Sequence, residues 1–163
     1  MRPRIRKGNA DPEHARQMSE PTSAQPSAPE KSCGSCTECC RMMAVNELKK
    51  PAWTACTHCA AGVGCKIYPQ RPQSCRDFNC GWLMAPYMGP ELKPDKCHII
   101  FFQPDAHTMV ANCDPAWPDA WRAPHVTAFL HFLAKAFARR VVLVRVENRF
   151  WRIFEDRVMQ ITS

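Results

Sequence analysis

The sequence contains no long run of apolar residues and no internal repeat. A helix that crosses a bilayer needs about 20 consecutive apolar residues, so a membrane-spanning protein is excluded. The basic start of the chain is followed by acidic residues instead of an apolar stretch, so neither a secretory signal nor a transit peptide is expected. A length of 163 residues leaves no room for a second large catalytic domain. We therefore expect a single-domain cytoplasmic protein without membrane contacts.

Strongly clustered positive charge is also absent, although the formal net charge is +7. Residues 1–31 carry six Lys or Arg against four Asp or Glu, and the arginine-rich stretch 139–157 includes three acidic residues. Such mixed charge favours an ordinary basic surface over the continuous basic patch that nucleic acid requires. Nucleic acid is therefore not the expected partner.

Cysteine, by contrast, is abundant and concentrated in one region. The chain has 11 cysteines, and nine of them lie between Cys33 and Cys80. Such clustering indicates either a disulfide framework in an oxidising compartment or a set of thiolates that binds metal in a reducing one. The expected cytoplasmic location and the odd number of cysteines both favour metal.

Composition divides the chain into a tail and one domain. Residues 1–31 hold five prolines and almost no large apolar side chains, so they are predicted to be a disordered tail. Residues 32–163 form the expected cysteine-cluster domain. Its metal-binding segment, 32–82, contains four of the six glycines and shows no strand or long-helix periodicity, which predicts loops.

Regular structure is predicted in residues 97–163. Residues 97–103 and 107–112 flank a Pro-Asp turn and predict a β-hairpin, and 141–146 and 149–154 predict a second one. Apolar side chains in 124–138 recur at helical spacing: Val126, Phe129, Leu130, Leu133 and Phe137. The predicted class is α+β, with a loop-rich, metal-knit module, a small antiparallel sheet and one packing helix.

The first cysteine motif reads CxxCxxCC from Cys33 to Cys40. A C-x2-C spacing lets two thiolates reach one metal from a single tight turn. In an extended chain the adjacent side chains of Cys39 and Cys40 point to opposite sides, so they do not readily bind one metal ion together. In a helix, Cys39 would turn away from the face shared by Cys33, Cys36 and Cys40. Either the pair serves two metals or one thiol is spare.

Five further cysteines follow: Cys56, Cys59, Cys65, Cys75 and Cys80. Nine thiols exceed one tetrahedral site, so they supply either two four-ligand sites with one left over, or one site with additional thiols around it. Two separate C-x2-C pairs are typical of zinc, whereas the number of thiols favours an iron–sulfur cluster. Spacing alone supports zinc and iron–sulfur about equally.

Residues 32–82 resemble a known family. The residues that carry the resemblance are CxxCxxCC at 33–40, Trp53-x2-Cys56-x-His58-Cys59, and Cys65-x-Ile67-Tyr68-x2-Arg71-Pro72-x2-Cys75, continued by Cys80 and Trp82. This pattern, over about residues 32–82, is similar to the YkgJ-type cysteine-cluster family of bacterial zinc- or iron-chelating domains. The resemblance implies metal chelation with these ligands: Cys33, Cys36, Cys39, Cys40, Cys56, Cys59, Cys65, Cys75 and Cys80.

A similar cluster occurs in the longer flagellin lysine N-methylases, but no glycine-rich nucleotide loop follows a strand here, so that activity is not carried over. The expected function is a metal-binding module with a binding or accessory role, for which a protein partner remains to be identified. One alternative is an iron–sulfur redox or methyltransfer-associated enzyme component, and a second is a zinc-dependent nucleic-acid binder. The sequence leaves open whether the chain is an enzyme.

Other conspicuous residues receive structural interpretations. Cys97 and Cys113 lie in or beside the first hairpin and are expected to fill the core. His58 is expected to support the ligands of the Cys56–Cys59 turn without binding metal itself. His125 and His131 lack the i, i+4 spacing of a zinc-binding pair and are expected to be solvated.

Overall fold

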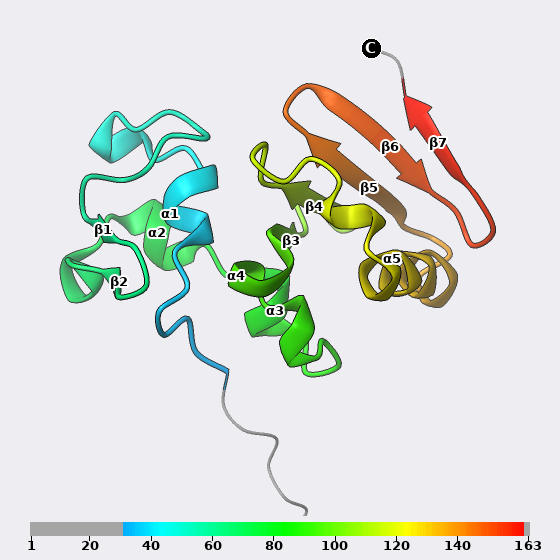
Figure 1. Cartoon of the computed structure of the whole chain (residues 1–163), viewed down its shortest axis with the longest axis horizontal. Coiled ribbons are helices and arrows are strands. Elements are labelled where there is room, and N and C mark those ends of the chain that lie inside the picture. The colour runs from blue at the N-terminus through cyan, green and yellow to red at the C-terminus, as the bar shows by residue number, and fades with distance from the viewer. Residues whose placement is uncertain (1–30, 162–163) are drawn as a thin grey trace, which may run out of the picture.

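The computed structural model describes residues 31–161. The predicted disordered tail, 1–31, lies outside the described residues except for Lys31. The chain forms two halves that lie side by side (Figure 1): α1, α2, β1 and β2 lie in one half, the large sheet and α5 in the other, and α3 and α4 lie between them. The predicted α+β class is confirmed. None of the helices within residues 31–161 is both long and apolar enough to cross a bilayer.

The first half is built from short elements, as its glycines and prolines predict. The helices and strands up to the large sheet are α1 (Glu38–Met42), β1 (Cys59–Ala60), β2 (Gly64–Cys65), α2 (Gln73–Asp77), α3 (Gly81–Met84) and α4 (Pro94–Cys97). Three single-turn 3-10 helices, Asn46–Leu48, Tyr68–Gln70 and Pro90–Leu92, connect them. Strands β1 and β2 pair antiparallel, with Cys59 opposite Cys65. Loops and single turns therefore position most of the cysteines.

The second half contains a five-stranded sheet in the order β3-β4-β5-β6-β7. Its strands are β3 (Ile99–Phe102), β4 (Thr108–Cys113), β5 (Val141–Val146), β6 (Arg149–Ile153) and β7 (Val158–Ile161). Both predicted hairpins, β3–β4 and β5–β6, are confirmed as antiparallel pairs. The sheet as a whole is mixed, because β4 and β5 pair parallel. Parallel pairing is possible because α5 connects the two strands and returns the chain to the end of the sheet at which β4 starts.

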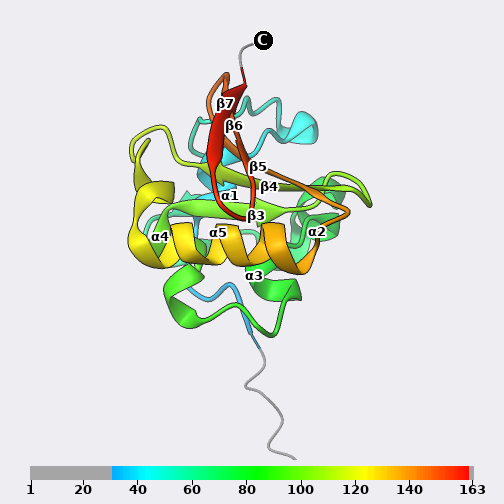
Figure 2. The same ribbon diagram turned by 90° about the vertical axis from the view of Figure 1, so that its right-hand side faces the viewer.

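Helix α5 (Pro124–Ala136) covers one face of this sheet (Figure 2) and confirms the predicted helix. Its first residue is proline, which suits the first helical position because its missing N–H has no intrahelical partner there. Val126, Leu130 and Leu133 are buried against the sheet. Cys97 and Cys113 belong to the same core, as expected for small apolar fillers. A further 3-10 turn, Ala120–Arg122, leads into the helix.

Helix α1 contacts β3 from the first half of the molecule. Ile100 of β3 and Met42 of α1 are fully buried but lie outside the core that α5 covers. Because successive strand residues point to opposite faces, Ile100 occupies the face opposite that of Ile99 and Phe101. The edge-to-face contact of Phe78 with Phe102, with ring centroids 6.3 Å apart, joins the halves at a second point. The cysteine-rich half is therefore packed onto the sheet and is not a loose appendage.

Candidate metal centre

The nine predicted ligands are contributed by six short segments of the first half. Their positions are the turn before α1 (Cys33, Cys36), α1 itself (Cys39, Cys40), the turn into β1 (Cys56, Cys59), β2 (Cys65), α2 (Cys75) and the residue before α3 (Cys80). All eleven cysteines lie within the described residues and are free thiols, so the disulfide framework considered from the sequence is not formed.

Two separate C-x2-C pairs, Cys33 with Cys36 and Cys56 with Cys59, form the tight turns that their spacing predicts. The amide of Cys36 donates to the carbonyl of Cys33 at 2.9 Å, and the amide of Cys59 donates to that of Cys56 at 2.9 Å. The two motifs are also linked, because the amide of Cys56 donates to the carbonyl of Cys40 at 3.0 Å. Backbone hydrogen bonds thus hold the first and second cysteine motifs together.

Most of these thiols border one common cavity. Its volume is about 310 Å³, and seven of the nine cysteines line it: Cys33, Cys36, Cys39, Cys40, Cys56, Cys65 and Cys75. The other two are close to that set, since Cys59 lies opposite Cys65 in the β1–β2 pair and Cys80 directly follows Asn79, which lines the cavity. The structure therefore brings all nine sequence-predicted residues into one region.

The adjacent cysteines Cys39 and Cys40 both border the cavity. Cys39 does not turn away from the others: it lines the cavity beside Cys40, and the two side chains are hydrogen-bonded. The helical case considered from the sequence does not arise, because α1 begins only at Glu38 and Cys33 and Cys36 lie before it. The hydrogen bond from Cys39 lowers the pKa of Cys40 to about 6 and raises the pKa of Cys39. Of this pair, Cys40 is therefore the thiol that ionises more readily.

The remaining perturbed thiols are held in the neutral form. Burial raises the pKa of Cys36 to about 11 and also raises the pKa values of Cys33, Cys59 and Cys75. Without a cation these sites favour protonated thiols, because a buried negative charge loses its hydration. A bound metal supplies the positive charge that ionises such ligands.

One buried ammonium group lies beside the cluster. Lys50 is only 7% exposed, and its Nζ donates to the carbonyl oxygens of Met43 and, at 3.1 Å, of Pro51. Burial lowers the pKa of Lys50, whereas the nearby cysteines Cys56 and Cys40 raise it. The chain therefore places a positive charge where thiolates gather.

The sulfur atoms do not form a ready tetrahedron. Among the residues that the structure describes, no cysteine belongs to a group of three or more ligand atoms within 4.8 Å of one another. Four sulfurs bound to zinc at about 2.3 Å would lie roughly 3.8 Å apart. The arrangement is a cavity with thiols on its walls, not a collapsed single-ion site.

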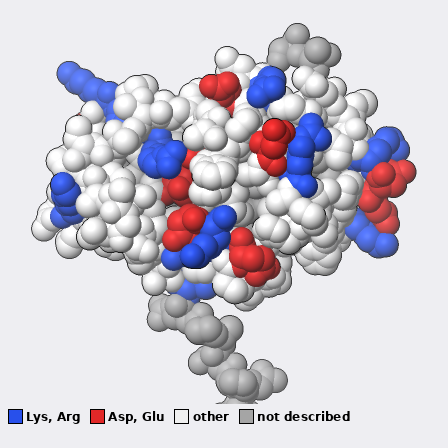
Figure 3. Space-filling model, in the orientation of Figure 1, with Lys and Arg blue, Asp and Glu red and all other residues white. Residues whose placement is uncertain are grey.

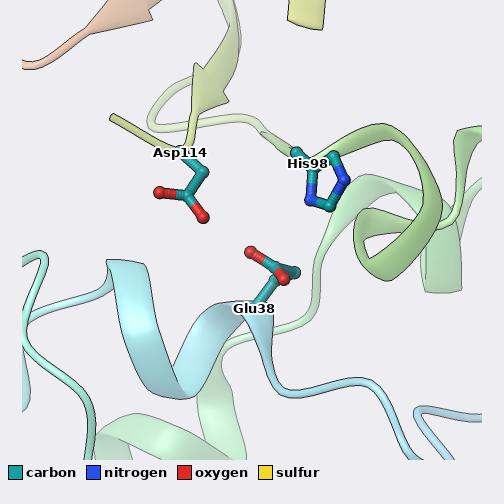
Figure 4. Close-up of side chains that lie close together, drawn as sticks. All are labelled: Glu38, His98 and Asp114. Atoms are coloured by element: carbon teal, nitrogen blue, oxygen red, sulfur yellow. The ribbon is translucent and has the colours of Figure 1, made fainter. Parts of the chain in front are cut away.

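The group that does satisfy this distance was missed by the sequence analysis. Glu38, His98 and Asp114 bring three ligand atoms within 4.8 Å of one another, and Figure 4 shows the three side chains converging from α1, from the residue before β3 and from the residue after β4. Each is adjacent in sequence to a cysteine (Cys39, Cys97 and Cys113), but their wide separation along the chain gave no motif.

The other polar residues singled out from the sequence have structural partners. Arg71 lines the cavity and donates from Nε to the carbonyl of Cys75 at 3.2 Å, with its guanidinium 3.8 Å from the Tyr68 ring centroid. His131 is half-buried, and its Nδ1 lies 2.6 Å from the carbonyl oxygen of Phe154, so the expectation that it is solvated was wrong. His125 is exposed, as expected.

Comparison with known proteins adds no relative to this picture. No protein-family model, curated protein or solved structure matches the chain. The resemblance to the YkgJ-type family therefore rests on the cysteine motif alone.

Proposed function

We propose that this chain is a YkgJ-type cysteine-cluster protein of the cytoplasm whose nine clustered thiols bind a metal centre, and that it serves as a binding or accessory module. The observation that carries the proposal is the shared cavity: seven cysteines from five separate segments border about 310 Å³. Thiols at 33–80 have no reason to converge for packing alone, since nine half-buried polarisable groups stabilise a core less than aliphatic side chains do.

The donor geometry favours an iron–sulfur cluster over a single zinc ion. Zinc holds its ligands in a compact tetrahedron, whereas a polynuclear cluster occupies the space between its cysteines. Thiols that are spread around a cavity, with no three ligand atoms within 4.8 Å among the described cysteines, suit the larger group. Such a cluster, when bound, supplies electron transfer or an iron site for a substrate.

The chain's own residues provide the environment for this group. Leu48, Ile67 and Leu83 line the cavity with apolar surface that excludes water. The buried Lys50 ammonium offsets part of the negative charge of the thiolates around it. The lowered pKa of Cys40 makes it the natural first ligand, whereas burial raises the pKa of Cys36, so this thiol loses its proton as metal binds.

Metal binding would also explain how the first half folds. The continuous apolar core lies between the large sheet, α3, α4 and α5, and the cysteine segment 32–82 contributes only Cys80 and Trp82 to it. A structural zinc ion, for comparison, contributes roughly 10–16 kcal/mol of apparent folding free energy in zinc-finger peptides. Removing the metal with a chelator should therefore lower the free energy of unfolding of the chain, which urea denaturation measures.

A nucleic-acid function receives no comparable support. Figure 3 shows that, on the face it presents, positive side chains lie beside negative ones and no broad area carries positive charge alone. The exposed Lys135 and Arg122 are each paired with a carboxylate, at 2.8 and 3.1 Å. We therefore retain the metal-binding function alone.

The test is analysis of iron, acid-labile sulfide and zinc in full-length protein produced and purified without oxygen. Two variants remove predicted ligands, Cys36→Ser and Cys75→Ser. The matched control is Cys113→Ala, because Cys113 is fully buried in the sheet core and lines no part of the cavity. We expect iron and sulfide with broad visible absorbance in the parent and the control, and less than half that content in both ligand variants.

Stoichiometric zinc without sulfide, lost in both ligand variants, would keep the metal centre but overturn its assignment as iron–sulfur. Metal content that is unchanged by Cys36→Ser and Cys75→Ser would refute the cavity as the binding site. Absence of every metal, in a folded protein insensitive to chelators, would refute the proposed function altogether.

A further inference from the structure

The junction between the two halves contains a second constellation of ligand atoms that the thiol cavity does not use. Glu38 lies in the first turn of α1, His98 directly precedes β3 and Asp114 directly follows β4. One ligand atom from each lies within 4.8 Å of the other two, as Figure 4 illustrates. None of the three residues lines the cavity that the cysteines share.

Two atoms in this junction lack partners although they are buried. Glu38 is 5% exposed, and its Oε2 has no hydrogen-bond partner among the described residues. The Nδ1 atom of His98 is likewise buried and unpartnered there. A buried polar atom without a partner costs about 1–3 kcal/mol, so two within one small cluster call for a ligand that satisfies both.

Charge in the junction is only partly balanced. Asp114, 3% exposed, accepts from the Ala116 amide at 3.0 Å and from the Arg41 guanidinium. The same guanidinium lies 3.9 Å from Glu38 Oε1, which is a weak contact. One cation therefore faces two buried carboxylates, and a net negative charge remains beside the unpartnered atoms.

The backbone of His98 and a stacked aromatic ring fix the position of its imidazole. His98 adopts a left-handed conformation with φ of 58°, and its amide donates to the Pro94 carbonyl at 2.9 Å, which caps α4. Its imidazole is stacked on the Trp117 ring at a centroid distance of 4.3 Å and an interplanar angle of 4°. A rigid imidazole opposed by buried carboxylates is the arrangement of a preorganised site.

We propose that Glu38, His98 and Asp114 form a binding site for a divalent first-row cation such as Mn²⁺, chemically separate from the thiol cluster. Two carboxylates and one imidazole suit such ions, whereas thiolates select softer metals. Asp114 and Arg41 also line a neighbouring cavity of about 210 Å³, which gives the site a route to solvent and space for water ligands. The cation would join α1 to both ends of the β3–β4 hairpin. This inference does not depend on the thiol cluster binding metal.

Manganese is the discriminating probe, because Mn²⁺ prefers oxygen and nitrogen ligands and competes poorly for thiolates. Full-length protein, as isolated without oxygen, is titrated with Mn²⁺, and the loss of the free-ion EPR signal measures binding. The test variants, Glu38→Gln and Asp114→Asn, keep side-chain shape but remove charge. Glu155→Gln is the control, since this exposed carboxylate is paired only with Lys135 at the protein surface. Cys36→Ser is included to remove a predicted ligand of the other site.

We expect about one Mn²⁺ per chain in the parent, in Glu155→Gln and in Cys36→Ser, with affinity lowered about tenfold or more in Glu38→Gln and Asp114→Asn. Mn²⁺ should also raise the melting temperature of the parent but not of these two variants, whose circular dichroism reports whether they fold. No binding at millimolar Mn²⁺ would overturn the proposal and leave a proton on Glu38 as the partner of His98. Equal affinity in folded Glu38→Gln, or loss of binding in Cys36→Ser but not in Glu38→Gln, would overturn it as well.

Discussion

The amide of Asp114 donates a hydrogen bond of 2.9 Å to the carbonyl oxygen of His98, one position beyond the terminal Ile99–Cys113 pair of the β3–β4 hairpin. This bond makes the two residues cross-strand neighbours at one end of the sheet, and Glu38 of α1 lies close to both of them there. Because Cys113 is packed in the apolar core beneath α5, the position of Asp114 is set by that core. The sheet core therefore fixes two of the residues against which α1 of the cysteine-rich half packs.

The buried Lys50 ammonium provides a test of the electrostatics around the thiol cavity. Lys50→Met removes two hydrogen bonds to the carbonyls of Met43 and Pro51, together with a positive charge near Cys40 and Cys56. We expect a loss of about 2–4 kcal/mol in the free energy of unfolding, measured by urea denaturation, and a lower metal content per chain. Lys66→Met, at an exposed site in the same half, should change neither quantity; equal effects of the two substitutions would contradict this account.

The Cys39–Cys40 hydrogen bond predicts a pH-dependent reactivity in the metal-free protein. The pKa of Cys40 is lowered to about 6, chiefly by this bond, so Cys40 is mostly thiolate at pH 7 and mostly thiol at pH 5. Only the thiolate is nucleophilic, so alkylation of Cys40 by iodoacetamide should rise through pH 6 and then level off. Cys36, with a pKa raised to about 11 by burial, should stay unreactive over this range.

Cys39→Ala supplies the control for that profile. Loss of the hydrogen bond should move the pKa of Cys40 upward toward its ordinary value, so that alkylation at pH 7 slows and its midpoint shifts to higher pH. Peptide mapping by mass spectrometry after timed alkylation identifies the modified residue. An unchanged midpoint for Cys40 in the variant would show that another group lowers its pKa.

Sequence patterns predicted the second half of the fold much better than the first. The apolar spacing of Val126, Leu130 and Leu133 located α5, and the Pro-Asp turn located the β3–β4 hairpin, because both signals are local. Strand β7 carried no such signal, since every one of its residues is exposed and its pairing with β6 is a matter of backbone hydrogen bonds. The parallel β4–β5 pairing is non-local and has no residue signature.

The same distinction applies to the sites. The thiol cavity was predictable because cysteine is rare and its spacing in 33–80 reports a shared ligand. Glu38, His98 and Asp114 are common residue types separated by 60 and 16 positions, and only the packing of α1 on the β3–β4 hairpin brings them together. The burial of Glu38 and Asp114, which distinguishes them from ordinary surface carboxylates, and the half-burial of His98 are tertiary properties.

The close approach of two glycine loops predicts a steric requirement at the thiol cavity. Gly64 has φ of 123°, and a Cβ there would lie 3.0 Å from the carbonyl oxygen of Gly34, in the turn that carries Cys33 and Cys36. Gly64→Ala should therefore cost roughly 2–5 kcal/mol of stability, from backbone strain and overpacking, and reduce metal content by displacing that turn. Thermal unfolding and metal analysis of the purified variant measure the two effects.

Gly62→Ala is the matched comparison for this substitution. Gly62 also has positive φ, 70°, but nothing lies within 4 Å of its added Cβ. We expect a cost of about 1–2 kcal/mol from the left-handed backbone alone, with full metal content. If Gly62→Ala lost as much metal as Gly64→Ala, strain in the β1–β2 turn, and not the contact with Gly34, would control the site.

Arg41 has two opposite effects at the junction of the halves: it stabilises the buried carboxylates and it competes with a bound cation. Its guanidinium is bonded to Asp114 and lies 3.9 Å from Glu38, so it partly neutralises the carboxylates that we assign to a divalent cation. Arg41→Gln should lower the metal-free free energy of unfolding by about 1–3 kcal/mol, because two buried carboxylates lose their only counter-charge within the described residues. The same substitution should raise the affinity for Mn²⁺ about tenfold or more, since a competing cation is removed.

These opposite signs make the prediction specific to a cation site. Arg122→Gln is the control, because Arg122 contacts the exposed carboxylate of Asp119 and the Trp121 ring and no residue of the cation site. We expect it to change stability by about 1 kcal/mol or less and Mn²⁺ affinity not at all. Urea unfolding with and without Mn²⁺ gives both quantities from one set of samples. If Mn²⁺ bound more weakly to Arg41→Gln than to the parent, the guanidinium would have to be positioning Asp114 for the ion, and the charge competition inferred here would be wrong.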